Sequence, residues 1–184
     1  MPVKNRASSS PLARGLVQVF TGDGRGKTSA ALGTAMRASG YGLKTCVVFF
    51  MKGKHRLGEY KVLSELANVD WIAFGRGSLL GSEDIRAEDR ELGRKALMAA
   101  RRAMESGQYD LVVMDEINTA AAWKVVDLES VLKLIKDKPD NVELILTGRY
   151  AVPEMVAAAD LVTEMTNIKH PYDKGIEARK GIDY

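Results

Sequence analysis

Short apolar runs alternate with segments that carry apolar side chains every three or four positions. The runs that predict strands are Leu16–Phe20, Thr45–Phe50, Val69–Phe74, Leu111–Met114, Val142–Leu146 and Leu161–Glu164. Most of these runs are apolar throughout, which is typical of strands that are buried on both faces of a parallel sheet. The chain is therefore expected to build its core around such a sheet.

The segments between the apolar runs predict helices. They are Lys27–Ser39, Glu59–Ala67, Glu83–Glu105, Leu128–Lys136 and Pro153–Ala159. Ser82 and Asp127 are the predicted N-caps of two of them, and Gly40 and Gly107 are predicted stops. A repeated strand–helix order of this kind indicates an α/β fold, with a mostly parallel sheet and helices on both faces.

A glycine-rich loop joins the first strand to the first helix. Residues 21–28 read Thr-Gly-Asp-Gly-Arg-Gly-Lys-Thr. Glycines let the backbone curl with its N–H groups inward, and the helix N-terminus adds partial positive charge. The Lys27 ammonium can reach phosphate oxygens, and the Thr28 hydroxyl can ligate Mg²⁺. These features predict a P-loop NTPase-like (RecA-like) domain. Its predicted triphosphate ligands are Gly22, Asp23, Gly24, Arg25, Gly26, Lys27 and Thr28.

The loop departs from the usual spacing, which places a glycine five residues before the glycine of Gly-Lys. That position is Thr21, and the first glycine, Gly22, comes one residue later. A shortened loop should hold phosphates differently, so ordinary hydrolysis of the γ-phosphate does not follow from the motif. The alternative interpretation is a glycine-rich turn that only joins a strand to a helix.

Further polar residues follow the other predicted strands. Ligands of parallel sheets bind beyond the carboxyl ends of the strands. The segments at those ends are 21–28, 51–58, 75–82, 115–118 and 147–149. Five loops on one edge of a sheet predict one composite site.

Two adjacent acids, Asp115 and Glu116, end the fourth predicted strand. Carboxylates at this place in P-loop proteins hold Mg²⁺ directly or through water. Adjacent strand residues point to opposite sides, so one acid is expected to face the metal and the other to support it. The spacing does not say which one. The alternative is a solvated start of a loop.

Basic residues also lie at this edge. Arg149 ends the fifth strand and could neutralise a polyphosphate, although a surface salt bridge is the other interpretation. The loop with Lys52, Lys54, His55 and Arg56 could face phosphate or an acidic ligand, but a solvated basic loop is at least as common. His55 and His170 are the two histidines of the chain, which favours a mechanism without an imidazole base.

Composition narrows the class of protein. The chain has 184 residues, 46% of them hydrophobic and 28% charged, and no apolar run approaches the length of about 20 that a membrane span needs. Residues 1–14 are polar and predict a mobile arm rather than a secretory signal, which leaves 15–184 as one domain. Cys46 is the only cysteine, which fits a reducing, cytoplasmic setting.

Net charge argues against a nucleic-acid partner. The chain has 27 basic and 24 acidic residues. Lys4, Arg6 and Arg14 lie in the arm, so the remainder carries 24 of each sign. A balanced body gives no basic face for a duplex.

Taken together, the chain resembles the P-loop type of ATP:corrinoid adenosyltransferases over roughly residues 15–184. Three stretches carry the resemblance. They are Phe20-Thr-Gly-Asp-Gly-Arg-Gly-Lys-Thr28, Val112-Val-Met-Asp-Glu-Ile-Asn118, and an ending that runs from Ile145-Leu-Thr-Gly-Arg149 through Ile168-Lys-His-Pro-Tyr-Asp-Lys-Gly175 to Arg179-Lys-Gly-Ile-Asp-Tyr184.

The resemblance implies transfer of the 5′-deoxyadenosyl group of ATP to the Co(I) centre of a corrinoid, with release of triphosphate. In this family ATP lies reversed in the loop, and Co(I) is itself the nucleophile. Gly22 to Lys27 would wrap the triphosphate. Thr28 and Glu116 would bind Mg²⁺ (or Mn²⁺), with Asp115 supporting them. Lys27, Thr28 and Glu116 are thus the expected catalytic residues.

The family binds its corrinoid with the loop after the third strand. The corresponding residues are Gly75, Gly77, Ser78, Leu79 and Leu80. Some members carry a Phe and a Trp there, where this chain has Ser78 and Leu80. The resemblance also implies a homodimer, a flavoprotein reductant and a role in cobalamin biosynthesis or salvage.

Two other functions are kept as alternatives. One is an ordinary P-loop ATPase or small-molecule kinase, which would expose the γ-phosphate to an acceptor. The other is a nucleotide-dependent module that binds a corrinoid without chemical turnover.

Overall fold

The computed structural model describes residues 12–53, 57–76 and 81–183. Within these residues a parallel sheet of six strands has the order β3-β2-β4-β5-β1-β6. The strands are β1 (Val17–Thr21), β2 (Thr45–Phe50), β3 (Val69–Phe74), β4 (Leu111–Asp115), β5 (Glu143–Thr147) and β6 (Leu161–Glu164). The α/β fold and its parallel sheet are confirmed.

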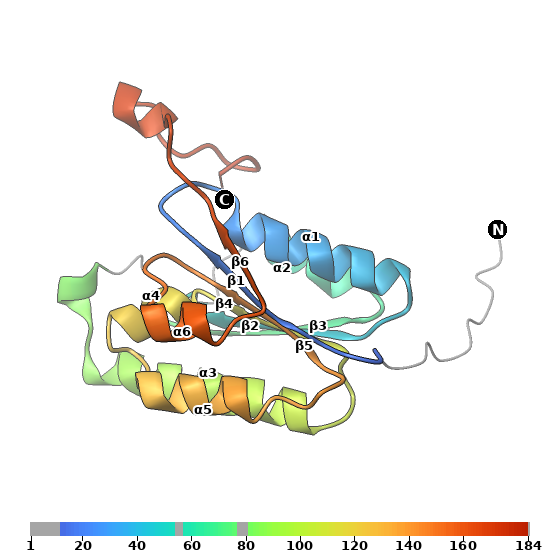
Figure 1. Ribbon diagram of the computed structural model, residues 1–184. Coiled ribbons are helices and arrows are strands. Elements are labelled where there is room, and N and C mark those ends of the chain that lie inside the picture. The colour runs from blue at the N-terminus through green and yellow to red at the C-terminus, as the bar shows by residue number, and fades with distance from the viewer. Residues whose placement is uncertain (1–11, 54–56, 77–80, 184) are drawn as a thin grey trace, which may run out of the picture.

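Helices cover both faces of the sheet (Figure 1). The α-helices are α1 (Lys27–Gly40), α2 (Gly58–Glu65), α3 (Ala87–Glu105), α4 (Ile117–Ala122), α5 (Leu128–Lys136) and α6 (Pro153–Ala157). Short 3₁₀ turns lie at Ser82–Asp84 (η1) and Pro171–Lys174 (η2). In Figure 1, α1 and α2 lie on one side of the sheet and α3, α5 and α6 on the other. None of the helices described is long and apolar enough to cross a membrane.

Strand alternation divides the core into two clusters. In β2, Val47 and Phe49 pack toward α1 and α2, whereas Val48 and Phe50 pack toward the opposite helices. All six residues of β2 are buried. A strand that is covered on both faces in this way favours apolar residues at successive positions, which explains the unbroken apolar run Cys46–Phe50 that follows Thr45.

The prediction of one helix over 83–105 with Ser82 as its N-cap is wrong. Ile85 and Arg86 are extended, and α3 begins only at Ala87. The Arg86 N–H donates to Asp89 Oδ2 at 2.8 Å, while Asp89 Oδ1 accepts from Arg76 Nε at 2.7 Å. Asp89 is buried, so this ion pair with the end of β3 fixes where the helix starts.

Candidate nucleotide site

The glycine loop between β1 and α1 is packed against the chain that follows β6. Gly22 and Gly26 have φ values of 93° and 118°, which favour glycine. A Cβ on Gly22 or Gly24 would lie 2.5 or 2.6 Å from the carbonyl oxygen of Met165. The Gly24 N–H donates to that same oxygen at 2.6 Å. The loop therefore needs small residues at both positions, and Met165 is a supporting residue that sequence reasoning missed.

Lys27 folds back over the loop that precedes it. Its Nζ donates to the carbonyl oxygens of Gly22 at 2.7 Å and Gly24 at 2.6 Å. The residue is 8% exposed. Burial lowers the pKa of Lys27, although the carboxylate of Glu116 acts in the opposite direction. The ammonium group is thus held at the mouth of the loop by carbonyl groups that a phosphate could replace.

Asp115 is the inner of the two acids, and it is fully buried at the end of β4. Its Oδ1 accepts from the Thr147 hydroxyl at 2.7 Å, and its Oδ2 accepts from Lys52 Nζ at 2.6 Å. Lys52 Nζ also lies 3.5 Å from Thr28 Oγ1. Burial alone would lower the pKa of Lys52, but the carboxylates of Asp115, Glu116 and Glu59 together outweigh burial and raise that pKa. The structure places Lys52 inside the site, where the sequence had left it open.

Glu116 turns the other way, toward the cleft. It adopts φ 65° and occupies the N-cap position of α4. Its N–H donates to Thr147 Oγ1 at 3.0 Å, and its Oε2 accepts from the Thr119 hydroxyl at 2.8 Å. Thr119 Oγ1 also accepts from the Arg149 N–H at 2.9 Å. Hydrogen bonds to Thr147 and Thr119 therefore connect Asp115, Glu116 and the residues at the end of β5 in one network.

Asn118 joins the strands beneath this network. Its Nδ2 donates to the carbonyl oxygens of Phe20 and Gly148, both at 3.1 Å. The side chain is buried, and its Oδ1 has no partner among the described residues. Gly148 has φ 129°, and a Cβ there would lie 2.8 Å from Thr119 Oγ1. This crowding explains the glycine before Arg149.

A cleft of about 840 Å³ brings the predicted residues together. Those on its lining are Asp23, Gly24, Arg25, Gly26, Lys27, Thr28, Glu116 and Arg149, joined by Lys52. Gly22 and Asp115 are not on the lining. Asp115 is buried beside the cleft, where it contacts Lys52. Gly75 lies just after β3 against the backbone of Met51 and Lys52. Lys54, His55, Arg56, Gly77, Ser78, Leu79 and Leu80 lie outside the described residues, as do residues 1–11 of the predicted arm.

The C-terminal tail forms the outer wall of the cleft. His170, Tyr172 and Ile182 of this tail line it opposite the glycine loop. Arg25 bonds to Asp183 at 2.5 Å and to the carbonyl oxygen of Ile182. Figure 1 shows the tail, coloured red, beside the loop that leads into α1. The sequence left open whether the tail packs near the site or frays, because the tail has no regular periodicity.

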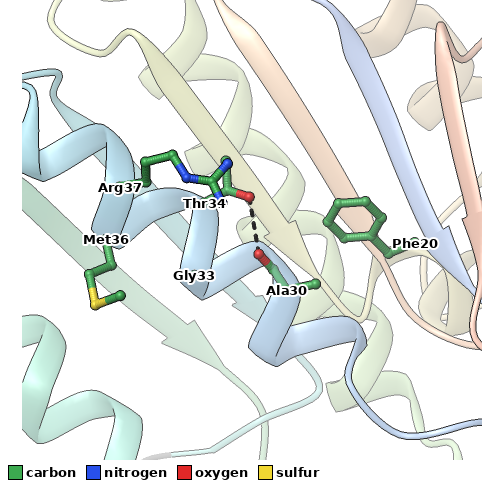
Figure 2. A pocket seen from close by; sticks show the side chains of 6 residues that line it. All are labelled: Phe20, Ala30, Gly33, Thr34, Met36 and Arg37. Carbon is green, nitrogen blue, oxygen red and sulfur yellow. Dashed lines mark hydrogen bonds between the residues drawn. The ribbon is translucent and has the colours of Figure 1, made fainter.

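A second hollow, of about 620 Å³, lies on α1 against β1 (Figure 2). Its lining residues are Phe20, Ala30, Gly33, Thr34, Met36 and Arg37, none of which lines the cleft. The Thr34 hydroxyl donates to the Ala30 carbonyl of its own helix at 3.1 Å, as Figure 2 shows. The concentration of charged groups and backbone donors at the cleft makes that cleft the candidate site.

A glycine loop that opens a helix, a Lys-Thr pair at its end and an acid-tipped parallel strand define a P-loop nucleotide-binding protein. Within that class, the chain belongs to a known family. Residues 13–184 match the family described as "ATP:corrinoid adenosyltransferase BtuR/CobO/CobP".

Individual relatives agree with this assignment. The chain is 35% identical to the corrinoid adenosyltransferase of Escherichia coli over 182 residues, which cover 99% of this chain and 92% of the relative. It is 36% identical to the corrinoid adenosyltransferase of Pseudomonas aeruginosa over 172 residues, 93% of this chain and 84% of the relative. The solved cytoplasmic domain of EssC shares the fold alone. Its TM-score is 0.50 and its identity 14%, over 92% of this chain and 34% of that one.

Proposed function

We propose that this protein transfers the 5′-deoxyadenosyl group of ATP to the Co(I) centre of a corrinoid and releases triphosphate. The observation that carries the proposal is the shortened glycine loop, packed against Met165 at Gly22 and Gly24. Membership of the adenosyltransferase family supports the same reaction.

Charged side chains are proposed to hold much of the triphosphate. One loop N–H, that of Gly24, already donates to Met165, so fewer backbone donors are left for phosphate. Arg25, Lys27 and Arg149 line the same cleft and can supply the remaining positive charge. Gly22 to Lys27 would then wrap the polyphosphate with its ribose end directed away from the loop.

For this reaction the protein needs mainly to orient ATP and the corrinoid and to stabilise the charge that develops on the leaving triphosphate. The electron pair of Co(I) attacks C5′ of the ribose and forms the Co–C bond. The C5′–O bond breaks, and its electron pair leaves with the triphosphate. No proton moves, so no side-chain base is needed. Lys27 and Arg149 can stabilise the charge on the leaving group, and Lys27, Thr28 and Glu116 are the proposed catalytic residues.

We further propose that Thr28 and Glu116 hold Mg²⁺, supported by Asp115. The residues fit such an ion, because Thr28 and Glu116 line the same cleft and a cation, the Lys52 ammonium group, already lies against Thr28 Oγ1 and Asp115 Oδ2. When bound, Mg²⁺ would neutralise triphosphate charge. The protein's own part is to hold these oxygens in place, which the bonds from Thr147 and Thr119 accomplish.

The corrinoid is proposed to lie at the end of β3, beyond Gly75. The remaining residues of that prediction, Gly77, Ser78, Leu79 and Leu80, stay predictions. Some members of the family carry a Phe and a Trp where this chain has Ser78 and Leu80, so its contacts with the corrinoid are expected to differ from theirs. A flavoprotein as the source of electrons likewise stays a prediction from the family.

A homodimer is part of the proposal as well. The edge strand β6 leaves Leu161 42% and Val162 41% exposed, and such residues on a sheet edge favour an interface. Light scattering should give about twice the mass of one chain, 20.1 kDa. A mass of one chain at micromolar concentration would contradict the dimer.

The reaction is tested by its products. The protein is incubated with ATP and chemically reduced cob(I)alamin, and the phosphate products are separated. Triphosphate in equal amount to adenosylcobalamin is expected over many turnovers. ADP with phosphate, or a phosphorylated acceptor, would favour an ATPase or kinase. One equivalent of bound corrinoid without turnover would favour a binding module.

A further inference from the structure

The ammonium group of Lys52 stands where P-loop proteins place their metal ion. Its Nζ is 2.6 Å from Asp115 Oδ2 and 3.5 Å from Thr28 Oγ1. Such proteins hold Mg²⁺ with the residue after the loop lysine and with an acid at the end of this strand. Here these two groups are Thr28, a proposed ligand, and Asp115, which supports the proposed ligand Glu116. In this structure a full positive charge already lies between them.

The position of this charge is well defined from several sides. The Phe49 ring centroid is 5.5 Å from Lys52 Nζ, within the range of a cation–π contact. A Cβ on Gly75 would lie 2.8 Å from the backbone nitrogen of Lys52, so the end of β3 presses directly on this residue. Asp115 is in turn fixed by Thr147. Lys52 is therefore built into the site rather than left on a solvated loop.

Electrostatics explain why a cation belongs there. Asp115 is 0% exposed, and a buried carboxylate without a positive partner is strongly destabilising. Lys52 supplies that partner. A metal ion would satisfy the same oxygens, but two cations so close together repel each other strongly at the low dielectric of a protein interior. The ammonium group and the metal ion therefore compete for one position.

We propose that Lys52 is the resident cation of the metal site, and that its ammonium group must move away from Thr28, a proposed metal ligand, and from Asp115, which supports the site, for a metal ion to bind. The proposal rests on the metal site proposed above. It has a consequence for the order of binding. A metal ion alone should bind weakly, whereas an ion that arrives on the triphosphate brings enough favourable contacts to displace the ammonium group. Lys52 would thereby couple metal binding to nucleotide binding.

The test measures Mn²⁺ binding without ATP or corrinoid, by the EPR signal of free Mn²⁺. Lys52→Met removes the ammonium group and should raise Mn²⁺ affinity by about tenfold or more. Lys27→Met is the matched control. It removes an equal charge from the same cleft, but this charge bonds to Gly22 and Gly24. The Mn²⁺ affinity of Lys27→Met should therefore rise by less than about threefold. Unchanged affinity in Lys52→Met, or equal gains in the two variants, would overturn the proposal.

A second measurement guards against a variant that is merely unstable. Lys52→Met leaves Asp115 without its positively charged partner, so the Tm of the variant should be lower than that of the wild type. Mn²⁺ should raise the Tm of the variant by more than it raises the Tm of the wild type. The double variant Lys52→Met/Asp115→Asn should lose this response to Mn²⁺. If Lys52→Met folds only with Mn²⁺, the proposal is supported, and misfolding that Mn²⁺ does not correct would overturn it. Neither measurement depends on adenosyl transfer, so a failure of the proposed reaction remains distinguishable.

Discussion

The floor and the outer wall of the cleft are held in different ways. The floor rests on the ends of β4 and β5 and the start of α4, where Asp115, Thr147 and Asn118 are buried and bonded across distant parts of the chain. The outer wall consists of the C-terminal tail, whose residues are mostly exposed and whose anchor is the exposed pair Arg25–Asp183. The floor is therefore organised before any ligand binds, whereas the tail can open at little cost.

This difference suggests separate tasks for the two walls. Groups that must be positioned accurately against the reacting atoms lie on the floor and glycine loop. The tail closes the opposite side, where a large corrinoid and ATP have to enter and their products leave. Changes in the floor should affect chemistry and stability, and changes in the tail should affect binding and release.

The largest effect is expected from Lys27→Ala. Loss of its ammonium group removes charge stabilisation at the leaving triphosphate, and kcat/KM should fall by about 10²–10³-fold. Initial rates of adenosylcobalamin formation measure this, with circular dichroism to show that the fold persists. A variant with a near-normal rate would remove Lys27 from the site.

Gly24→Ala should disturb the contact between the glycine loop and Met165, the residue that directly follows β6. The added Cβ would lie 2.6 Å from the Met165 carbonyl oxygen, so loop or strand must shift, and stability should fall by about 2 kcal/mol. Urea unfolding measures the change. Gly33→Ala in α1 is the matched control, since its Cβ would meet nothing within 4 Å and the helix should gain about 0.5–1 kcal/mol. Equal effects in both variants would show that the loop does not depend on this contact.

Glu116→Ala should raise the Mg²⁺ concentration needed for half-maximal activity by about tenfold. The variant removes the carboxylate that lines the cleft but keeps Asp115 and its bonds. Titration of Mg²⁺ at saturating ATP gives the value. Unchanged metal dependence would exclude Glu116 as a metal ligand.

The smallest effect is expected from Asp183→Asn in the tail. The pKa of Asp183 is lowered by its bonds to the Arg179 backbone and side chain, with Arg25 nearby, so this anchor is present above the ordinary carboxyl pKa and is lost as pH falls through the lowered value. At neutral pH the variant should have an unchanged Tm, faster proteolysis of the tail and a few-fold higher KM for ATP. Lys180→Gln serves as the control. Unchanged proteolysis would show that Arg25–Asp183 does not hold the tail.

Sequence reasoning succeeded where a signal was local. The strands β2 and β3 were predicted with their observed ends, and Asp127 caps α5 through Ser130 as expected. The glycine loop, Lys27 and Thr28 were found because their spacing encodes a backbone shape. Strand positions and the glycine loop can therefore be predicted from buried apolar runs and short motifs in the sequence.

Prediction failed where the structure depends on contacts between distant residues. The short helix α4 follows β4 through one left-handed residue, Glu116, and has no long apolar period of its own. The sequence left open whether Lys52 faces a ligand or solvent, because its contact with Asp115 depends on β4, which is distant in the chain. The hydrogen bond from Gly24 to Met165 joins residues far apart in the chain, and neither segment carries a sequence pattern that predicts this contact.

The orientation of bound ATP tests the central claim most directly. A crystal structure with ATP and Mg²⁺ should show the triphosphate inside the loop 22–28 and the ribose C5′ exposed toward the end of β3, where cobalt can reach it. A nucleotide whose terminal phosphate points out of the loop toward an acceptor pocket would contradict adenosyl transfer.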